Sequence, residues 1–119
     1  MAKHNETGVK GEQIATRYLL NIGYKILSQN WRLGRKEVDC IARDGDLLVF
    51  IEIKTRHSFD FGFPEESVNH TKKNHIKQAA AAYSTRLRHQ SGLRFDIISI
   101  LLDASGEPKE ILHIKDAFY

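Results

Sequence analysis

The segment Leu47–Thr55 constrains the fold more than any other part of the chain, because it reads Leu-Leu-Val-Phe-Ile-Glu-Ile-Lys-Thr. It opens with an unbroken apolar run, so a strand formed here presents apolar side chains on both of its faces. Strands of this kind lie in the centre of a sheet that helices cover on both sides. The segment therefore predicts an α/β protein with a central strand at this position.

Two charged residues, Glu52 and Lys54, lie near the end of this apolar strand. Because side chains alternate along a strand, both point to the same face. Burying an unpaired charge there is strongly unfavourable. A salt bridge, solvent in a cleft or a bound metal ion must compensate these charges, which makes the end of the strand a candidate functional site.

The preceding strand brings a second carboxylate towards Glu52. An Asp-Gly-Asp sequence separates the two strands and favours a hairpin. If the two-residue loop begins at Asp44, Glu37 lies directly opposite Glu52. If it begins at Gly45, Asp39 lies there instead. Opposed side chains have Cβ atoms about 5 Å apart, and two carboxylates at that distance repel each other, so either register favours a cation between them.

Two carboxylates, backbone carbonyls and water suit a hard divalent ion, Mg²⁺ or Mn²⁺. The adjacent ammonium group of Lys54 can orient an attacking water or stabilise charge on a phosphate. Together these groups are the equipment of metal-assisted phosphodiester hydrolysis. The structural alternative is an acid–lysine pair that only links neighbouring strands, and the apolar strand around Glu52 favours the functional interpretation.

The rest of the chain supplies the other layers of the fold. Apolar residues at helical spacing predict helices over Thr7–Ile22, ending at Gly23, and over Thr71–Arg88. Further strands are predicted over 24–30, 37–43, 93–102 and 110–114, with a turn over 31–36 and a loop over 57–68. We expect a single domain over 1–119 with a mixed sheet, in which the strand after the second helix pairs parallel to a neighbour.

Glu12 and Lys72 are charged residues on the inward faces of the two predicted helices. Glu12 either complements the dipole of its helix or brings a third carboxylate to the site. Lys72 either extends to solvent past apolar neighbours or contacts a phosphate. Both interpretations stay open from the sequence.

The net charge of +3, from 18 basic and 15 acidic residues, permits nucleic-acid binding without demanding it. Basic residues near the predicted site form a rim that suits a polyanion. We take as candidate nucleic-acid contacts Arg32, Arg35, Arg56, Lys72, Lys73 and Lys77.

The chain has the features of a cytoplasmic protein without a membrane segment. Its only cysteine, Cys40, excludes an intrachain disulfide and is expected in the core. The N-terminus has no apolar stretch typical of a secretory signal, and the longest apolar run is too short to span a bilayer.

Several motifs form a combination that is specific as a set: Gly8-x-x-Gly11-Glu12, Gly23-Tyr24-x-Ile26-Leu27, Glu37-Val38-Asp39, Val49-Phe50-Ile51-Glu52-Ile53-Lys54, Arg94-Phe95-Asp96 and Ile114-Lys115-Asp116-Ala117-Phe118. With these motifs the chain resembles, over nearly its whole length, the YraN-like family of small bacterial proteins. That family is similar to the restriction-endonuclease-like superfamily with its PD-(D/E)xK site, although Val38 replaces the signature proline.

The resemblance implies an αβββαβ core with a mixed central sheet flanked by helices. It implies that Asp39 and Glu52 hold Mg²⁺ or Mn²⁺ and that Lys54 assists the attacking water. Glu12 resembles the first-helix glutamate that archaeal Holliday-junction resolvases place at their metal site, which also implies branched or damaged DNA as substrate, a role in DNA repair or recombination, and a homodimer.

Two functions follow from these observations. The first is a metal-dependent nuclease, with Asp39, Glu52 and Lys54 as catalytic residues and Glu12 and Glu37 as further metal ligands. The second is a non-catalytic nucleic-acid-binding protein that retains the nuclease fold. A third, an interaction domain whose charges only tie the sheet together, predicts no nucleic-acid binding at physiological salt.

Overall fold

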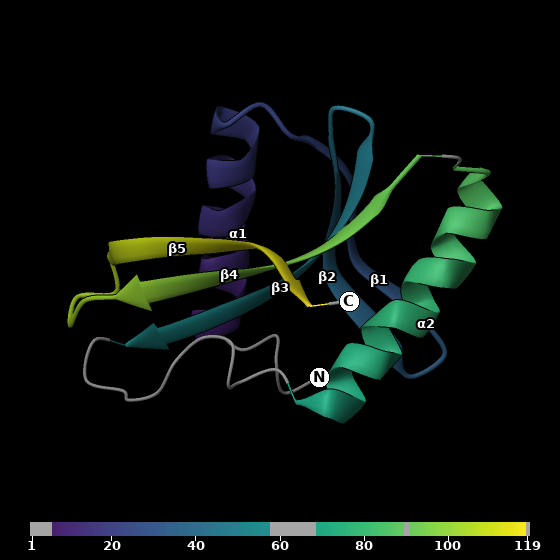
Figure 1. Cartoon of the computed structure of the whole chain (residues 1–119). Coiled ribbons are helices and arrows are strands. Elements are labelled where there is room, and N and C mark those ends of the chain that lie inside the picture. Colours follow the sequence, from purple (N-terminus) through teal and green to yellow (C-terminus); the bar gives the residue numbers. More distant parts are fainter. Residues whose placement is uncertain (1–5, 58–68, 90, 119) are drawn as a thin grey trace.

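In the computed structural model, two helices pack on opposite faces of a five-stranded sheet (Figure 1). The structure describes residues 6–57, 69–89 and 91–118. The elements follow in the order α1 (Glu6–Asn21), β1 (Lys25–Leu33), β2 (Lys36–Asp44), β3 (Leu47–His57), α2 (His70–Leu87), β4 (Leu93–Leu102) and β5 (Pro108–Phe118). This is the α/β architecture with a mixed sheet that the sequence predicts, and it is consistent with a restriction-endonuclease-like core.

The strands lie in the order β1-β2-β3-β4-β5, so each strand neighbours the next one along the chain. β3 and β4 are parallel, while every other pair is antiparallel. Parallel neighbours need a long connection, and α2 lies within it. The predicted parallel pairing after the second helix is therefore confirmed.

The β2–β3 hairpin adopts one of the two registers considered from the sequence. Asp44 pairs with Leu47, and Cys40 pairs with Ile51. The two-residue loop thus begins at Gly45, whose φ of +61° is a conformation that glycine adopts without strain. This register brings Asp39, rather than Glu37, to the position of Glu52.

Apolar residues form one core on each face of the sheet. The α1 core contains Ala15, Leu19, Tyr24, Cys40, Ala42, Val49, Ile51, Ile98, Ile100 and Leu102. The α2 core contains Val38, Ile41, Leu48, Phe50, Ile76, Ala79, Ala80, Ile97 and Phe118. Successive residues of β3 alternate between the two cores, which confirms β3 as a central strand buried on both faces.

The sheet edges differ from the prediction. β1 continues to Leu33, so the turn predicted over 31–36 is wrong and contracts to Gly34 and Arg35. Trp31 pairs with Val38 and packs edge-to-face on Tyr83 at 5.2 Å between ring centroids, and this packing outweighs the local polar composition. β5 is also longer than predicted. Of the predicted loop, His57 belongs to β3, and residues 58–68 lie outside the described part of the chain.

The helices lie close to their predicted bounds, but two residues of their predicted apolar faces are exposed. Ile22 is 44% exposed because α1 ends before it, and Leu87, at the last position of α2, is 42% exposed. Neither helix in the described ranges is both long and apolar enough to cross a membrane.

Gly11 allows α1 to approach β3 unusually closely. A Cβ atom added at Gly11 would lie 1.7 Å from the hydroxyl oxygen of Thr55. Any larger residue would therefore force the helix and strand apart. This contact brings the N-terminal half of α1, including Glu12, against the end of β3.

Candidate active site

Glu52 is the central residue of the candidate site. Its side chain is only 1% exposed, yet it is ionisable. Its Oε2 atom lies 3.1 Å from Nζ of Lys72 and 3.6 Å from Nζ of Lys54. Two ammonium groups from different elements therefore compensate the charge that the sequence places in an apolar strand.

The start of α2 positions Lys72. Asn69 caps the helix, because its side-chain oxygen accepts a hydrogen bond from the backbone N–H of Lys72 at 2.8 Å. The first turn of α2 thereby directs Lys72 towards Glu52 instead of away from the sheet. The structure thus brings Nζ of Lys72 to Glu52, and its contact with a phosphate stays a prediction.

A cleft of about 250 Å³ opens beside Glu52. It is lined by Thr7, Gly8, Glu12, Glu52, Ile53, Lys54, Thr55 and Lys72. The side chains of Lys54 and Lys72 are 29% and 30% exposed, so both reach solvent here. The cleft brings together four of the charged residues singled out in the sequence, from α1, β3 and α2.

Asp39 lies where β2 and β3 cease to pair. Their ladder ends at Cys40 and Ile51, and beyond it Oδ2 of Asp39 accepts a hydrogen bond from the backbone N–H of Ile53 at 2.8 Å. The carboxylate thus satisfies a buried backbone donor that the sheet leaves over. It is held next to the backbone of Glu52 with only 2% of its surface exposed.

The pKa of the Cys40 thiol is affected by the carboxylates of this region. Burial raises the pKa of its thiol to about 12, and the negative charges of Asp39 and Glu12 add to the effect. Both carboxylates therefore act on the same part of the core. Cys40 is buried, as predicted, and a thiol with so high a pKa is a poor nucleophile.

The four predicted metal ligands do not gather into one cage. Glu37 forms an ion pair with Arg32, with 3.4 Å between Oε2 and Nη2, and Oε1 of Glu12 accepts a hydrogen bond from Asn30 at 3.2 Å. Within residues 6–57, 69–89 and 91–118, no group of three or more His, Cys, Asp or Glu side chains is close enough to hold a metal ion.

Asp39 and Glu52 remain the donor set that fits a magnesium ion. Mg²⁺ is commonly held by one or two carboxylates and keeps several water molecules. Glu52 lines the cleft and Asp39 contacts the backbone of the next residue, Ile53, so the two carboxylates match that number of protein ligands, whereas a zinc site would need more.

The other basic candidates do not line the cleft and do not form one contact set. Arg35 lies in the β1–β2 loop and Arg56 near the end of β3. Lys73 and Lys77 follow Lys72 on α2, where Nζ of Lys73 lies 5.6 Å from the centroid of the Phe118 ring. Their contact with nucleic acid stays a prediction.

Sequence reasoning missed a second buried polar cluster around Asp96, which is 0% exposed. Its carboxylate accepts hydrogen bonds from Arg94 at 2.8 and 2.9 Å, from His113 at 2.7 Å and from the backbone N–H of Asp116 at 3.0 Å. His113 in turn contacts the hydroxyl of Tyr18 at 3.0 Å, which links β4 and β5 to α1. The motifs Arg94-Phe95-Asp96 and Ile114-Lys115-Asp116 contain part of this cluster, but a motif does not show which residues contact each other.

Comparison with known proteins places this site in a family. The model of "Uncharacterised protein family UPF0102" matches residues 11–100. The chain belongs to this family. A UPF0102 protein of Thermodesulfovibrio yellowstonii is 45% identical over 96% of each chain, and one of Rhodococcus opacus is 40% identical over 99% of this chain and all of the relative. UPF0102 is the YraN-like family that the sequence motifs resemble, and the match includes every residue of the cleft except Thr7 and Gly8.

Proposed function

We propose that this chain is a metal-dependent endonuclease that hydrolyses phosphodiester bonds in DNA. The observation that carries the proposal is Glu52, a buried carboxylate at the end of an apolar strand, which opens onto a cleft between two lysines and has Asp39 beside it. A core strand that served only packing would gain nothing from these charges, because apolar residues of similar volume are often as stabilising there.

The lysines supply the groups that a phosphate needs. Lys54 and Lys72 reach solvent in the cleft, so their ammonium groups can donate hydrogen bonds to non-bridging phosphate oxygens. Lys54 also orients the attacking water. In the net reaction the water oxygen bonds to phosphorus, the bond from phosphorus to the leaving sugar oxygen breaks, and that oxygen gains a proton.

Asp39 and Glu52 would hold Mg²⁺ or Mn²⁺. When bound, such an ion polarises the phosphate and lowers the pKa of a coordinated water. The two carboxylates orient differently, since Asp39 is fixed by the N–H of Ile53 and Glu52 by two side chains.

One observation favours a second function, non-catalytic nucleic-acid binding. Lys54 and Lys72 already neutralise Glu52 without a metal ion, and the described residues hold no larger ligand cluster. A protein of this kind would bind DNA in a salt-sensitive way, because phosphate contacts release counterions. It would neither require a metal ion nor cleave.

Calorimetric titration with Mn²⁺ separates the two functions. We expect the wild-type protein to bind the ion, and Asp39→Asn and Glu52→Gln to lose both ion binding and cleavage of labelled DNA. Glu110→Gln, at an exposed position of β5, is the matched control and should behave as wild type. Urea denaturation of each variant verifies that the fold is intact.

The outcomes are distinct. Cleavage that persists unchanged in Glu52→Gln would refute the nuclease proposal. If wild type and variants alike bind DNA but neither bind Mn²⁺ nor cleave, the non-catalytic function is correct.

A further inference from the structure

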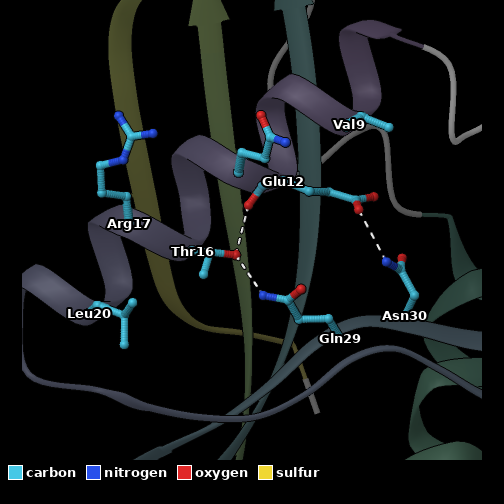
Figure 2. Close-up of a pocket in the computed structure, with 8 residues that line it drawn as sticks. Val9, Glu12, Thr16, Arg17, Leu20, Gln29 and Asn30 are labelled. Carbon is cyan, nitrogen blue, oxygen red and sulfur yellow. Dashed lines mark hydrogen bonds between the residues drawn. The ribbon is translucent and has the colours of Figure 1, made fainter.

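A second hollow, of about 520 Å³, lies between α1 and β1 (Figure 2). It is far larger than a metal ion requires and falls within the range of small-molecule pockets, roughly 300–1,000 Å³. Carboxamide groups from both elements line it, Gln13 from α1 and Gln29 and Asn30 from β1. The proposed hydrolytic reaction gives this hollow no task.

The polar groups of the hollow are held in fixed orientations. Oγ1 of Thr16 donates to the backbone carbonyl of Glu12 at 2.8 Å and accepts from Nε2 of Gln29 at 3.0 Å, as Figure 2 shows. A carboxamide has two N–H donors and one carbonyl acceptor. The contact with Thr16 uses one donor of Gln29, which leaves a donor and an acceptor side by side for a ligand.

The remaining lining combines apolar side chains, Val9 and Leu20, with one acidic and one basic side chain, Glu12 and Arg17. Val9 and Leu20 line the hollow although 41% and 55% of their surfaces are exposed. The carboxylate of Glu12 lies at its edge, held by Asn30 (Figure 2). The two opposite charges leave the hollow without a net charge, and a flat, neutral heterocycle with hydrogen-bonding edges would match both the carboxamides and the apolar side chains.

Glu12 also lines the cleft beside Glu52, so the hollow and the cleft adjoin. A nucleotide whose phosphate lies in the cleft therefore has the hollow within reach of a neighbouring base. Turning a paired base out of a duplex costs the energy of its stacking and pairing, whereas an unpaired base can turn into a side pocket at little cost.

We propose that the hollow between α1 and β1 receives one unpaired nucleobase of a DNA strand whose phosphate lies in the Glu52 cleft. This inference rests on the proposed function, because the cleft must hold DNA. It identifies the substrate as DNA with an unpaired nucleotide next to the bond that is cut. Gln13 and Gln29 contact the edge of the base, and the apolar side chains contact its faces.

Binding of defined oligonucleotides tests the inference. The probes are a labelled duplex with one unpaired nucleotide, the same duplex with an abasic residue at that position, and the fully paired duplex. The abasic probe keeps the bulge but lacks the base. Fluorescence anisotropy in Ca²⁺ at constant salt compares wild type, Gln13→Ala/Gln29→Ala and the control Gln78→Ala, which changes an exposed glutamine on α2.

We expect wild type and Gln78→Ala to bind the unpaired base at least about fivefold more tightly than the abasic probe, as expected for one good bidentate contact. The double variant should lose that preference and bind the paired duplex as wild type does. Equal binding of the base-containing and abasic probes by wild type would overturn the inference, as would a preference that survives in the double variant.

Cleavage in Mn²⁺ distinguishes failure of the inference from failure of the proposed function. Equal cleavage of all three probes would leave the nuclease in place and refute the base pocket. A preference for the unpaired base without any cleavage would support the pocket and refute the nuclease.

Discussion

Replacing Asp96 by asparagine should strongly destabilise this protein. The residue is wholly buried and accepts hydrogen bonds from Arg94, His113 and the backbone of Asp116. Asparagine keeps the shape but removes the charge and turns one acceptor into a donor. At least one of the donors then faces another donor, and the guanidinium of Arg94 loses its closest anion.

The expected loss is large relative to the stability of a small domain. Removing one partner of a buried ion pair costs about 3–5 kcal/mol, because the other charge stays buried without compensation. A domain of this size is stable by roughly 5–15 kcal/mol. Arg94 keeps hydrogen bonds to Asp44 at 3.0 Å and to Tyr24 at 2.6 Å, so we expect a value near the lower end of the range.

The loss should depend on pH with a definite sign. Burial by itself raises the pKa of Asp96, but hydrogen bonds from His113, Arg94 and Asp116 outweigh it, and the pKa lies below its ordinary value. A carboxyl group of this kind contributes stability above its unfolded pKa, about 3.9, and the contribution is lost as the pH falls through the folded pKa. The difference between wild type and variant should therefore be full at pH 7 and shrink in acid.

Urea denaturation at pH 7 and at successively lower pH measures this difference. Asp103→Asn is the control, since hydrogen bonds from Ser105 and the backbone of Glu107 also lower the pKa of Asp103, but on an open turn. It should destabilise less than Asp96→Asn. A loss below about 1 kcal/mol at pH 7, as for an exposed pair, or a loss that does not change with pH, would refute the reasoning.

Further predictions concern α1, α2 and the core. Gly11→Ala should destabilise by about 1–3 kcal/mol through overpacking against Thr55, and adding Thr55→Ala should recover part of the loss in thermal melting. Asn69→Ala should cost about 1 kcal/mol in urea denaturation, because it removes the cap on the N–H of Lys72; an unchanged midpoint would contradict this. Cys40 should not react with a thiol reagent at pH 8 until the protein unfolds, since burial raises its pKa to about 12; rapid labelling of the native protein would show the thiol to be accessible.

Local patterns were sufficient for the architecture because they reflect direct physical preferences. The apolar run of Leu47–Ile51 can be buried only where both faces are covered, and the structure places it there. Prediction failed at Trp31–Leu33, where neighbouring polar residues suggest a turn. The ring of Tyr83, which is distant in the sequence, packs on Trp31, and this contact stabilises β1 through Leu33.

The sequence by itself determined which residues carry charge inside an apolar strand, and hence that Glu52 and Lys54 need partners. Only the tertiary structure decided which residues are the partners of these charged side chains. The hairpin register selected Asp39 over Glu37, the packing of α2 brought Lys72 to Glu52, and α1 and β1 joined Glu12 to Asn30. The reason is physical: periodicity fixes the face on which a side chain lies, whereas a contact between elements depends on how whole helices and strands pack, which no single segment encodes.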